Sequence, residues 1–261
     1  MFARKHARYA SPVSLLAWTA SLGALGATAR NISTVPIPTS GRASLTRHDF
    51  PLGAYGSCGC AVNSTYFPTA ALSQAAYASS SAFGPACGQC FNLTLVETVL
   101  AVPTWILNEE QRRSVVVKVT DKCAAGSGDP KKGWCGATDK KTNKANLTLH
   151  FDLSTPSPSI PLSFFPTNES FYGYSDFGSW IVDFETVSCE NWTGWGNQSA
   201  FGIDPNLTSE SGCCPANPLL DNDVCSSFSL KSSAASLSTS TFFLNVSSLL
   251  LAVFLAHSAS V

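Results

Sequence analysis

Charged side chains are scarce in this sequence, and those present nearly cancel. Lys, Arg, Asp and Glu make up 13% of the 261 residues, and the formal net charge is −1. A protein that binds nucleic acid or an anionic surface needs a basic patch, so the composition argues against both partners. Few charges and many hydroxyl side chains fit a neutral, hydroxyl-rich partner such as a polysaccharide.

Metal-binding patterns are missing as well. Cys87 and Cys90 have the C-x-x-C spacing of a redox or zinc motif, but no second pair accompanies them and the 4 histidines do not cluster. We therefore predict no metal and no other cofactor. The 10 cysteines are an even number, which in a secreted chain indicates disulfides. The predicted half-cystines are Cys58, Cys60, Cys87, Cys90, Cys123, Cys135, Cys189, Cys213, Cys214 and Cys225.

No apolar run has the length of an ordinary membrane-spanning helix, about 20 residues. Residues 1–29 combine a basic start, a short apolar stretch and an A-x-A cleavage site, which predicts a secretory signal rather than a membrane anchor. Residues 242–256 form an uncharged apolar tail after a spacer of small and polar residues. This pattern favours a GPI-anchor signal over a C-terminal membrane helix.

These signals predict a protein outside the cell, in the cell wall or on the outer face of the plasma membrane. We predict a signal peptide at 1–29, a polar lead at 30–43, one globular domain at 44–230, and a spacer with anchor signal at 231–261. We also expect a monomer. Asn-x-Ser/Thr sequons indicate a glycoprotein. They begin at Asn31, Asn63, Asn92, Asn146, Asn168, Asn191, Asn197, Asn206 and Asn245.

Short segments of strand composition dominate the globular domain. Strands are predicted at residues 90–95, 114–119, 147–153 and 180–187, and a helix at residues 70–77. Within 147–153 apolar and polar side chains alternate, so Phe151 faces the core while His150 and Asp152 face the other way. The mixture indicates a small β-barrel with long loops. A carboxyl on a rigid strand, opposite the core face, suits a positioned proton donor.

Several motifs in order resemble the family 45 endoglucanases and the expansins. They lie at Ser57–Cys60, Gly84–Cys90, Val117–Cys123, His150–Leu153, Phe164–Pro166 and Val187–Trp192. The chain is similar above all to the fungal endoglucanase V-like branch of family 45. The resemblance implies a mainly β fold, a six-stranded double-psi β-barrel with long disulfide-tied loops and short peripheral helices. It also implies a secreted endo-β-1,4-glucanase that hydrolyses cell-wall β-glucan with inversion.

The resemblance assigns the role of general acid to Asp152, the acid of a His-Phe-Asp motif; a structural carboxylate is the alternative. Inverting hydrolysis also needs a base that activates water. Some family members carry it in a Thr-Arg-Tyr-aromatic-Asp segment, matched here by residues 46–49, one residue shorter. Asp49 is therefore the candidate base, or simply part of a turn. Another branch uses an Asn ahead of a Trp-Cys-Gly motif, and Lys131 stands at about that place.

Other residues of the motifs are candidates for binding the glucan. They are Thr120, Asp121, Trp134, His150 and Trp192. A turn cap is the alternative for the first two, and packing for the tryptophans. The rival function is a non-hydrolytic, expansin- or loosenin-like protein that binds and loosens wall polysaccharide, because expansins keep the His-Phe-Asp and Thr-Asp motifs without the base. A barwin-like defence or inhibitor module is a third reading of the same barrel.

Overall fold

The computed structural model describes residues 34–126, 133–219 and 223–228. The predicted signal peptide and anchor signal, and Lys131, lie outside these ranges. Within them, no helix combines the length and the apolar character needed to cross a bilayer.

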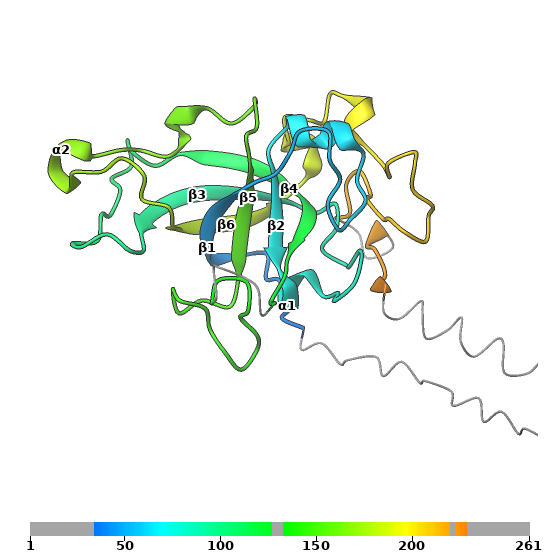
Figure 1. Ribbon diagram of the computed structural model, residues 1–261, viewed down its shortest axis with the longest axis horizontal. Helices are drawn as coiled ribbons and strands as arrows, with labels where there is room; N and C mark the ends of the chain where they lie inside the picture. Colours follow the sequence, from blue (N-terminus) through cyan, green and yellow to red (C-terminus); the bar gives the residue numbers. More distant parts are fainter. Residues whose placement is uncertain (1–33, 127–132, 220–222, 229–261) are drawn as a thin grey trace, which may run out of the picture. The chain divides into compact units, whose positions relative to one another are not determined.

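Six strands close into a barrel (Figure 1). They are β1 Ser40–Asp49, β2 Thr69–Ser73, β3 Cys90–Thr98, β4 Ser114–Cys123, β5 His150–Thr155 and β6 Trp180–Val187. The order around the barrel is β1-β5-β2-β4-β3-β6. β1 runs parallel to β5 and β2 to β4, whereas the other neighbours are antiparallel. The predicted fold class, a mainly β double-psi barrel, is confirmed.

Apolar side chains from alternate strand positions fill the barrel. Phe151 of β5 packs against Phe91 of β3 and Phe184 of β6, with ring centroids 5.2 and 5.9 Å apart. Burying one such side chain stabilises the fold by about 1.5–3 kcal/mol. Closure also leaves no free sheet edge in the barrel. The strands therefore form a rigid support for the polar side chains on their outer faces.

The predicted helix at residues 70–77 is wrong over its first half. Thr69–Ser73 is the strand β2, with all its side chains buried, and only Gln74–Tyr77 forms the helix α1. Small apolar residues are compatible with a helix or a strand. This segment forms a strand because it pairs with β4 and β5. The other helices are short and peripheral. They are η1 Val62–Tyr66, η2 Leu162–Phe164, α2 Glu169–Tyr172, η3 Cys189–Asn191 and η4 Gln198–Ala200.

The strand β1 was not predicted, and it begins inside the proposed polar lead at residues 30–43. Ala43 and Leu45 of β1 point into the core, while Ser44 and Thr46 point to the opposite face. The two apolar positions are too few to mark a strand by pattern alone. The other predicted strands are all present, with ends shifted by a few residues at most.

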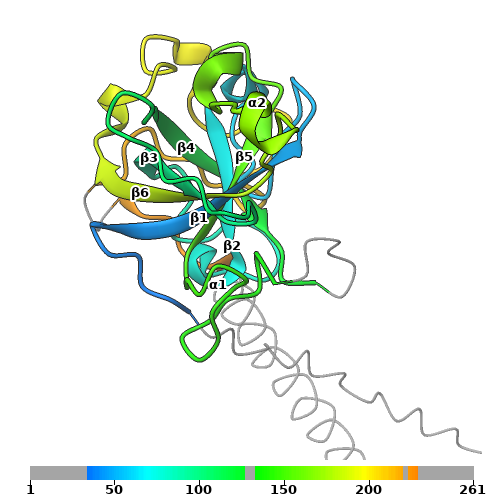
Figure 2. The ribbon, with the colours of Figure 1, turned by 90° about the vertical axis from the view of Figure 1, so that its left-hand side faces the viewer.

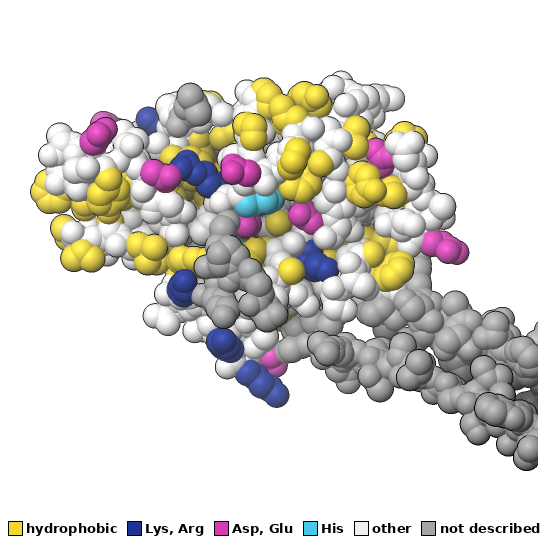
Figure 3. Space-filling model, viewed as in Figure 1, with side chains coloured by type: hydrophobic (Ala, Val, Ile, Leu, Met, Phe, Trp, Pro, Cys, Tyr) yellow, Lys and Arg dark blue, Asp and Glu magenta, His cyan; other side chains and the backbone are white. Residues whose placement is uncertain are grey.

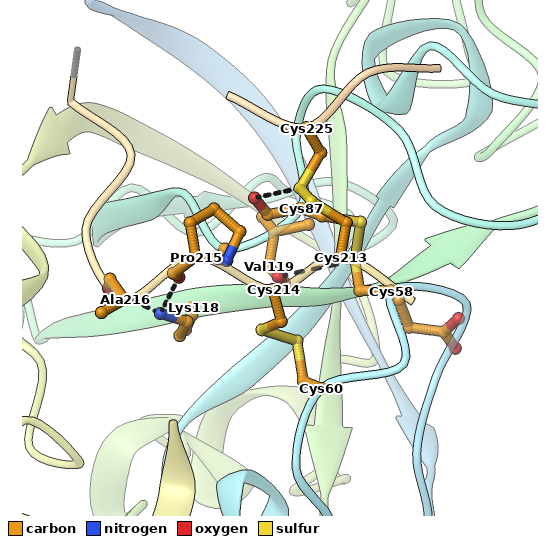
Figure 4. The surroundings of a disulfide bond; sticks show 12 residues. Cys58, Cys60, Cys87, Lys118, Val119, Cys213, Cys214, Pro215, Ala216 and Cys225 are labelled. Atoms are coloured by element: carbon orange, nitrogen blue, oxygen red, sulfur yellow. Dashed lines mark hydrogen bonds between the residues drawn. A yellow bond between two sulfur atoms is a disulfide. The ribbon is translucent and has the colours of Figure 1, made fainter. Parts of the chain in front are cut away.

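All ten cysteines pair, as predicted. The disulfides are Cys58–Cys87, Cys60–Cys214, Cys90–Cys189, Cys123–Cys135 and Cys213–Cys225. Figure 4 shows three of them where the C-terminal segment lies against β4. Lys118 of β4 is buried there, and its Nζ donates to the carbonyls of Pro215 and Ala216 at 2.8 and 2.7 Å. Burial lowers the pKa of Lys118 to about 8.

Candidate functional site

Asp152 lies in β5 between two core residues, Phe151 and Leu153, and its side chain faces away from the core as the alternation predicts. That outer face is nevertheless not open, because Asp152 is only 6% exposed. β1 flanks it on one side, with Thr46 in register with Asp152. The carboxyl is therefore fixed in a nearly closed position.

A chain of buried hydrogen bonds ends on Asp152. Thr46 Oγ1 donates to Asp152 Oδ1 at 2.5 Å. Because the Thr46 hydroxyl proton is used in that bond, Thr46 Oγ1 accepts from His150 Nε2 at 3.1 Å. His150 Nδ1 forms a hydrogen bond with Ser44 Oγ at 2.8 Å. Asn143 Nδ2 donates to Ser44 Oγ at 2.8 Å. Linked hydrogen bonds polarise one another, so the chain orients the Asp152 carboxyl from a distance.

His150 and Trp134, two of the predicted glucan contacts, lie beneath the surface beside Asp152. Both are buried, and their rings stack with centroids 5.6 Å apart and planes inclined by 24°. His150 has both ring nitrogens within the hydrogen-bond chain. Their place in this structure is to hold the Asp152 carboxyl, with Trp134 covering the imidazole.

Trp192 and Thr120, two more of the predicted glucan contacts, are also buried. Trp192 Nε1 donates to the carbonyl of Pro68 at 2.7 Å, and its ring packs edge-on against Phe67 with centroids 5.4 Å apart. Gly194 follows so closely that any Cβ there would meet the Trp192 ring at 2.3 Å. The packing alternative for this tryptophan therefore holds.

His48 is a site residue that the sequence did not single out. Its Nδ1 lies 3.6 Å from Asp152 Oδ2, and its side chain is 21% exposed. Its ring packs edge-on against Phe50, with centroids 5.6 Å apart. His48 thus separates the Asp152 carboxyl from solvent.

The structure does not bring Asp49 to Asp152. Thr46 hydrogen-bonds to Asp152, and His48 and Phe50 contact each other, so the even-numbered residues of β1 face the acid. Successive strand residues point to opposite faces, and exposed Asp49 therefore points away. Phe50, not a carboxylate, occupies the next position on the Asp152 side.

Asp121 is the second carboxylate on the Asp152 face. Ala71 of β2 is in register with Asp152 on one side and Asp121 on the other. Two strand spacings separate the acids, roughly 10 Å between Cα atoms. Asp121 Oδ1 accepts from the backbone N–H and the hydroxyl of Ser57, both at 2.7 Å. These two donors hold the Asp121 carboxyl in one orientation.

The loop that reaches Asp121 also carries an aromatic side chain that the sequence analysis missed. Gly56 packs so tightly on Asp121 that a Cβ would meet the Asp121 Cβ at 2.6 Å. Tyr55, directly before it, is 51% exposed. An exposed ring beside polar groups can stack on the CH face of a sugar, as the tryptophans were expected to do. Its position follows from the contact between this loop and β4, which no local pattern reveals.

The donor set beside Asp152 does not suit a metal ion. The sulfur atoms of Cys123 and Cys135 and a ring nitrogen of His150 lie within 4.8 Å of one another. The two sulfurs are bonded to each other, and a metal ligand would have to be a thiolate. His150 is already engaged by Ser44 and Thr46. The geometry of this face supports proton and hydroxyl chemistry.

Comparison with known proteins identifies the family of this chain. Residues 43–194 match the model of EXPB1-like domain 1. Among solved structures, the chain is similar to the β-1,4-D-endoglucanase Cel45A of the blue mussel Mytilus edulis, at 22% identity over 62% of this chain and 86% of that one, with a TM-score of 0.41. It is also similar to the GH45 endoglucanase EG27II with cellobiose, at 21% identity over 57% and 82%, with a TM-score of 0.41. No curated protein matches significantly.

Proposed function

Because this chain belongs to the EXPB1-like domain 1 family, of the expansin- and barwin-like superfamily, we propose that it is a wall protein that binds β-1,4-glucan and loosens it without cutting it. It would act outside the cell, held at the surface by the predicted GPI anchor. The residues proposed to meet the glucan are Asp121, His48 and Tyr55, with the buried Asp152 carboxyl directly behind His48.

Glucan binding is supported by the chemistry of the Asp152 face. Carboxylates accept hydrogen bonds from sugar hydroxyls, and such bonds to a charged group contribute about 1.5–3 kcal/mol. Asp121 is partly exposed and already oriented by Ser57. Tyr55 offers a ring to a sugar face. Hydroxyls held by these groups would no longer bond to a neighbouring glucan chain, and this exchange is the proposed loosening step.

The position of Asp49 is the observation that favours wall loosening over hydrolysis. An inverting hydrolase needs a base across the scissile bond from its acid, with the two carboxyls about 6.5–9.5 Å apart. Asp49 points away from the Asp152 face, and Phe50 stands on that face instead. The predicted pair of Asp152 and Asp49 therefore lacks the geometry for one reaction centre.

Inverting endo-β-1,4-glucan hydrolysis is the second candidate, with Asp121 in place of Asp49. The register of both acids with Ala71 favours it, since their spacing of roughly 10 Å between Cα atoms is compatible with a water between the carboxyls. In this alternative Asp152 donates the proton, and Asp121 activates the water.

The test compares two Asp→Asn variants from opposite faces of the barrel wall. Asp152→Asn should abolish the weakening of cellulose fibres under load, measured as extension at constant force. Asp49→Asn is the matched control and should weaken fibres as the unaltered protein does. Equal loss in both variants, or no weakening by the unaltered protein, would overturn the proposal. Sugar release that Asp121→Asn abolishes would establish the hydrolytic alternative.

A further inference from the structure

Large apolar side chains are exposed together at the end of the molecule that carries α2. Leu100, Val102 and Ile106 come from the loop after β3, and Phe171 and Tyr174 from α2 and the turn after it. We call these five residues the apolar lobe. Val102 is 91% exposed and Phe171 66%. Figure 3 shows hydrophobic side chains gathered at this end. Exposed apolar patches of this kind mark binding surfaces more often than isolated exposed side chains do.

The apolar lobe is built on a rigid support. Tyr172 Oη donates to the carbonyl of Pro103 at 3.0 Å, which joins the two segments. Behind them, the ring of Trp105 packs against Tyr172 and Phe177 with centroids 6.1 and 5.2 Å apart. Trp105 also contacts Trp180 of β6. A preorganised surface loses little conformational entropy on binding.

Arg47 links the apolar lobe to strand β1. Arg47 lies between Thr46 and His48 on β1, forms an ion pair with Asp176, and its guanidinium lies 5.3 Å from the centroid of the Phe165 ring. Asp176 and Tyr174 belong to the same turn after α2. Arg47, like Asp49, points away from the Asp152 face, so the lobe offers a contact separate from that face.

The apolar lobe lies far from the C-terminal end of the described barrel. Phe228, the last described residue, packs on Phe83 with ring centroids 5.5 Å apart. Figure 1 shows α2 at the opposite end of the barrel from this segment, and Figure 2 shows α2 facing the viewer with that segment behind. A chain tethered through its C-terminus would present the apolar lobe away from the membrane and toward the wall.

We propose that the apolar lobe docks on the flat, CH-bearing face of insoluble β-glucan. This inference rests on the proposed function. It makes the apolar lobe a second surface through which the protein binds β-glucan. The lobe itself bears no charge, which suits a neutral polymer, and two of its members are aromatic rings that can pack on sugar faces. A lipid surface is disfavoured because the lobe points away from the tethered end.

The test separates binding to soluble and insoluble glucan. The variants are Val102→Ser with Phe171→Ser, and Tyr174→Ala alone; Leu219→Ser is the control, since Leu219 is an exposed apolar residue outside the lobe. Adsorption to microcrystalline cellulose is measured by depletion, and binding of a soluble cello-oligosaccharide by calorimetry. We expect the double variant to adsorb roughly tenfold more weakly, with soluble binding and the control unchanged.

The outcomes distinguish this inference from the proposed function. If both lobe variants adsorb as tightly as the unaltered protein, while soluble glucan still binds, the lobe inference alone is overturned. If the unaltered protein binds neither soluble nor insoluble glucan, the proposed function fails and the inference with it. Loss of sedimentation with phosphatidylcholine vesicles in the lobe variants, with cellulose adsorption unchanged, would assign the lobe to lipid and overturn its assignment to glucan.

Discussion

Because of Lys118, the free energy of unfolding should rise with pH between about pH 8 and pH 10.5. Its Nζ is buried among the carbonyls of Pro215 and Ala216 and the rings of Trp192 and Phe201. Burial lowers its pKa from 10.5 to about 8. Between these values the unfolded chain holds a proton that the folded protein has lost, so the free energy of unfolding increases with pH. Below about pH 8 the folded state carries the full penalty.

The magnitude follows from that difference in pKa. A shift from 10.5 to about 8 corresponds to roughly 3 kcal/mol. Between about pH 7 and about pH 10, linkage predicts a gain of about 2.5 kcal/mol from this side chain alone. The neutral amine keeps two N–H groups, one for each carbonyl, so deprotonation need not break either hydrogen bond.

The assay is urea unfolding, followed by tryptophan fluorescence, at a series of pH values within this window. Lys118→Met should lose the pH-dependent gain, whereas the control Lys122→Met should retain it. Burial lowers the pKa of Lys122 too, but attraction to Asp121 opposes the effect. Burial raises the pKa of Tyr77, whose contribution is lost as pH rises above about 10, beyond the window. Parallel stability curves for the unaltered protein and Lys118→Met would refute the reasoning.

Three further predictions concern the site and its framework. Asn143→Ala should lower the free energy of unfolding by about 2–3 kcal/mol in urea, because it removes partners of Ser44 and two backbone N–H groups; a loss under about 0.5 kcal/mol would contradict the buried chain. Tyr55→Ala should weaken cello-oligosaccharide binding roughly tenfold by calorimetry at unchanged stability, and unaltered affinity would remove Tyr55 from the site. Replacing Cys60 and Cys214 together by Ser should cost about 4–5 kcal/mol in urea unfolding, and a change below about 1 kcal/mol would be inconsistent with a bridge spanning 154 residues.

Sequence periodicity predicted the inner face of the barrel but not what covers its outer face. The alternation in residues 147–153 placed Phe151 in the core and Asp152 opposite it, since strand geometry alone fixes both. Burial of Asp152 depends on Thr46 and His48 of β1, about a hundred residues earlier in the chain. Such long-range pairing has no local sequence signal.

The role expected of Asp49 shows how sensitive a strand site is to register. The match to residues 46–49 tolerated one missing residue, which is harmless in a loop. On β1, however, a shift of one residue turns a side chain to the opposite face of the sheet. His48 and Phe50 consequently stand where the motif led us to expect a carboxylate.

Neither Tyr55 nor the apolar lobe could be predicted from the sequence, for a related reason. Exposure of an aromatic residue depends on what the fold packs against it, and sequence composition treats Tyr55 and Trp192 alike. Trp192 has its indole N–H satisfied by the buried Pro68 carbonyl, whereas Tyr55 is exposed on a loop that contacts Asp121 through Gly56 and Ser57.

The release of reducing ends from a soluble β-1,4-glucan tests the central claim most directly. The purified protein and its Asp152→Asn variant are incubated with the glucan, and new reducing ends are counted while binding is measured in parallel. Our account predicts that the unaltered protein binds the glucan, and that both proteins release the same background of ends. Release well above that background, lost by about 10²-fold or more in Asp152→Asn, would show that the protein is a hydrolase and contradict the account.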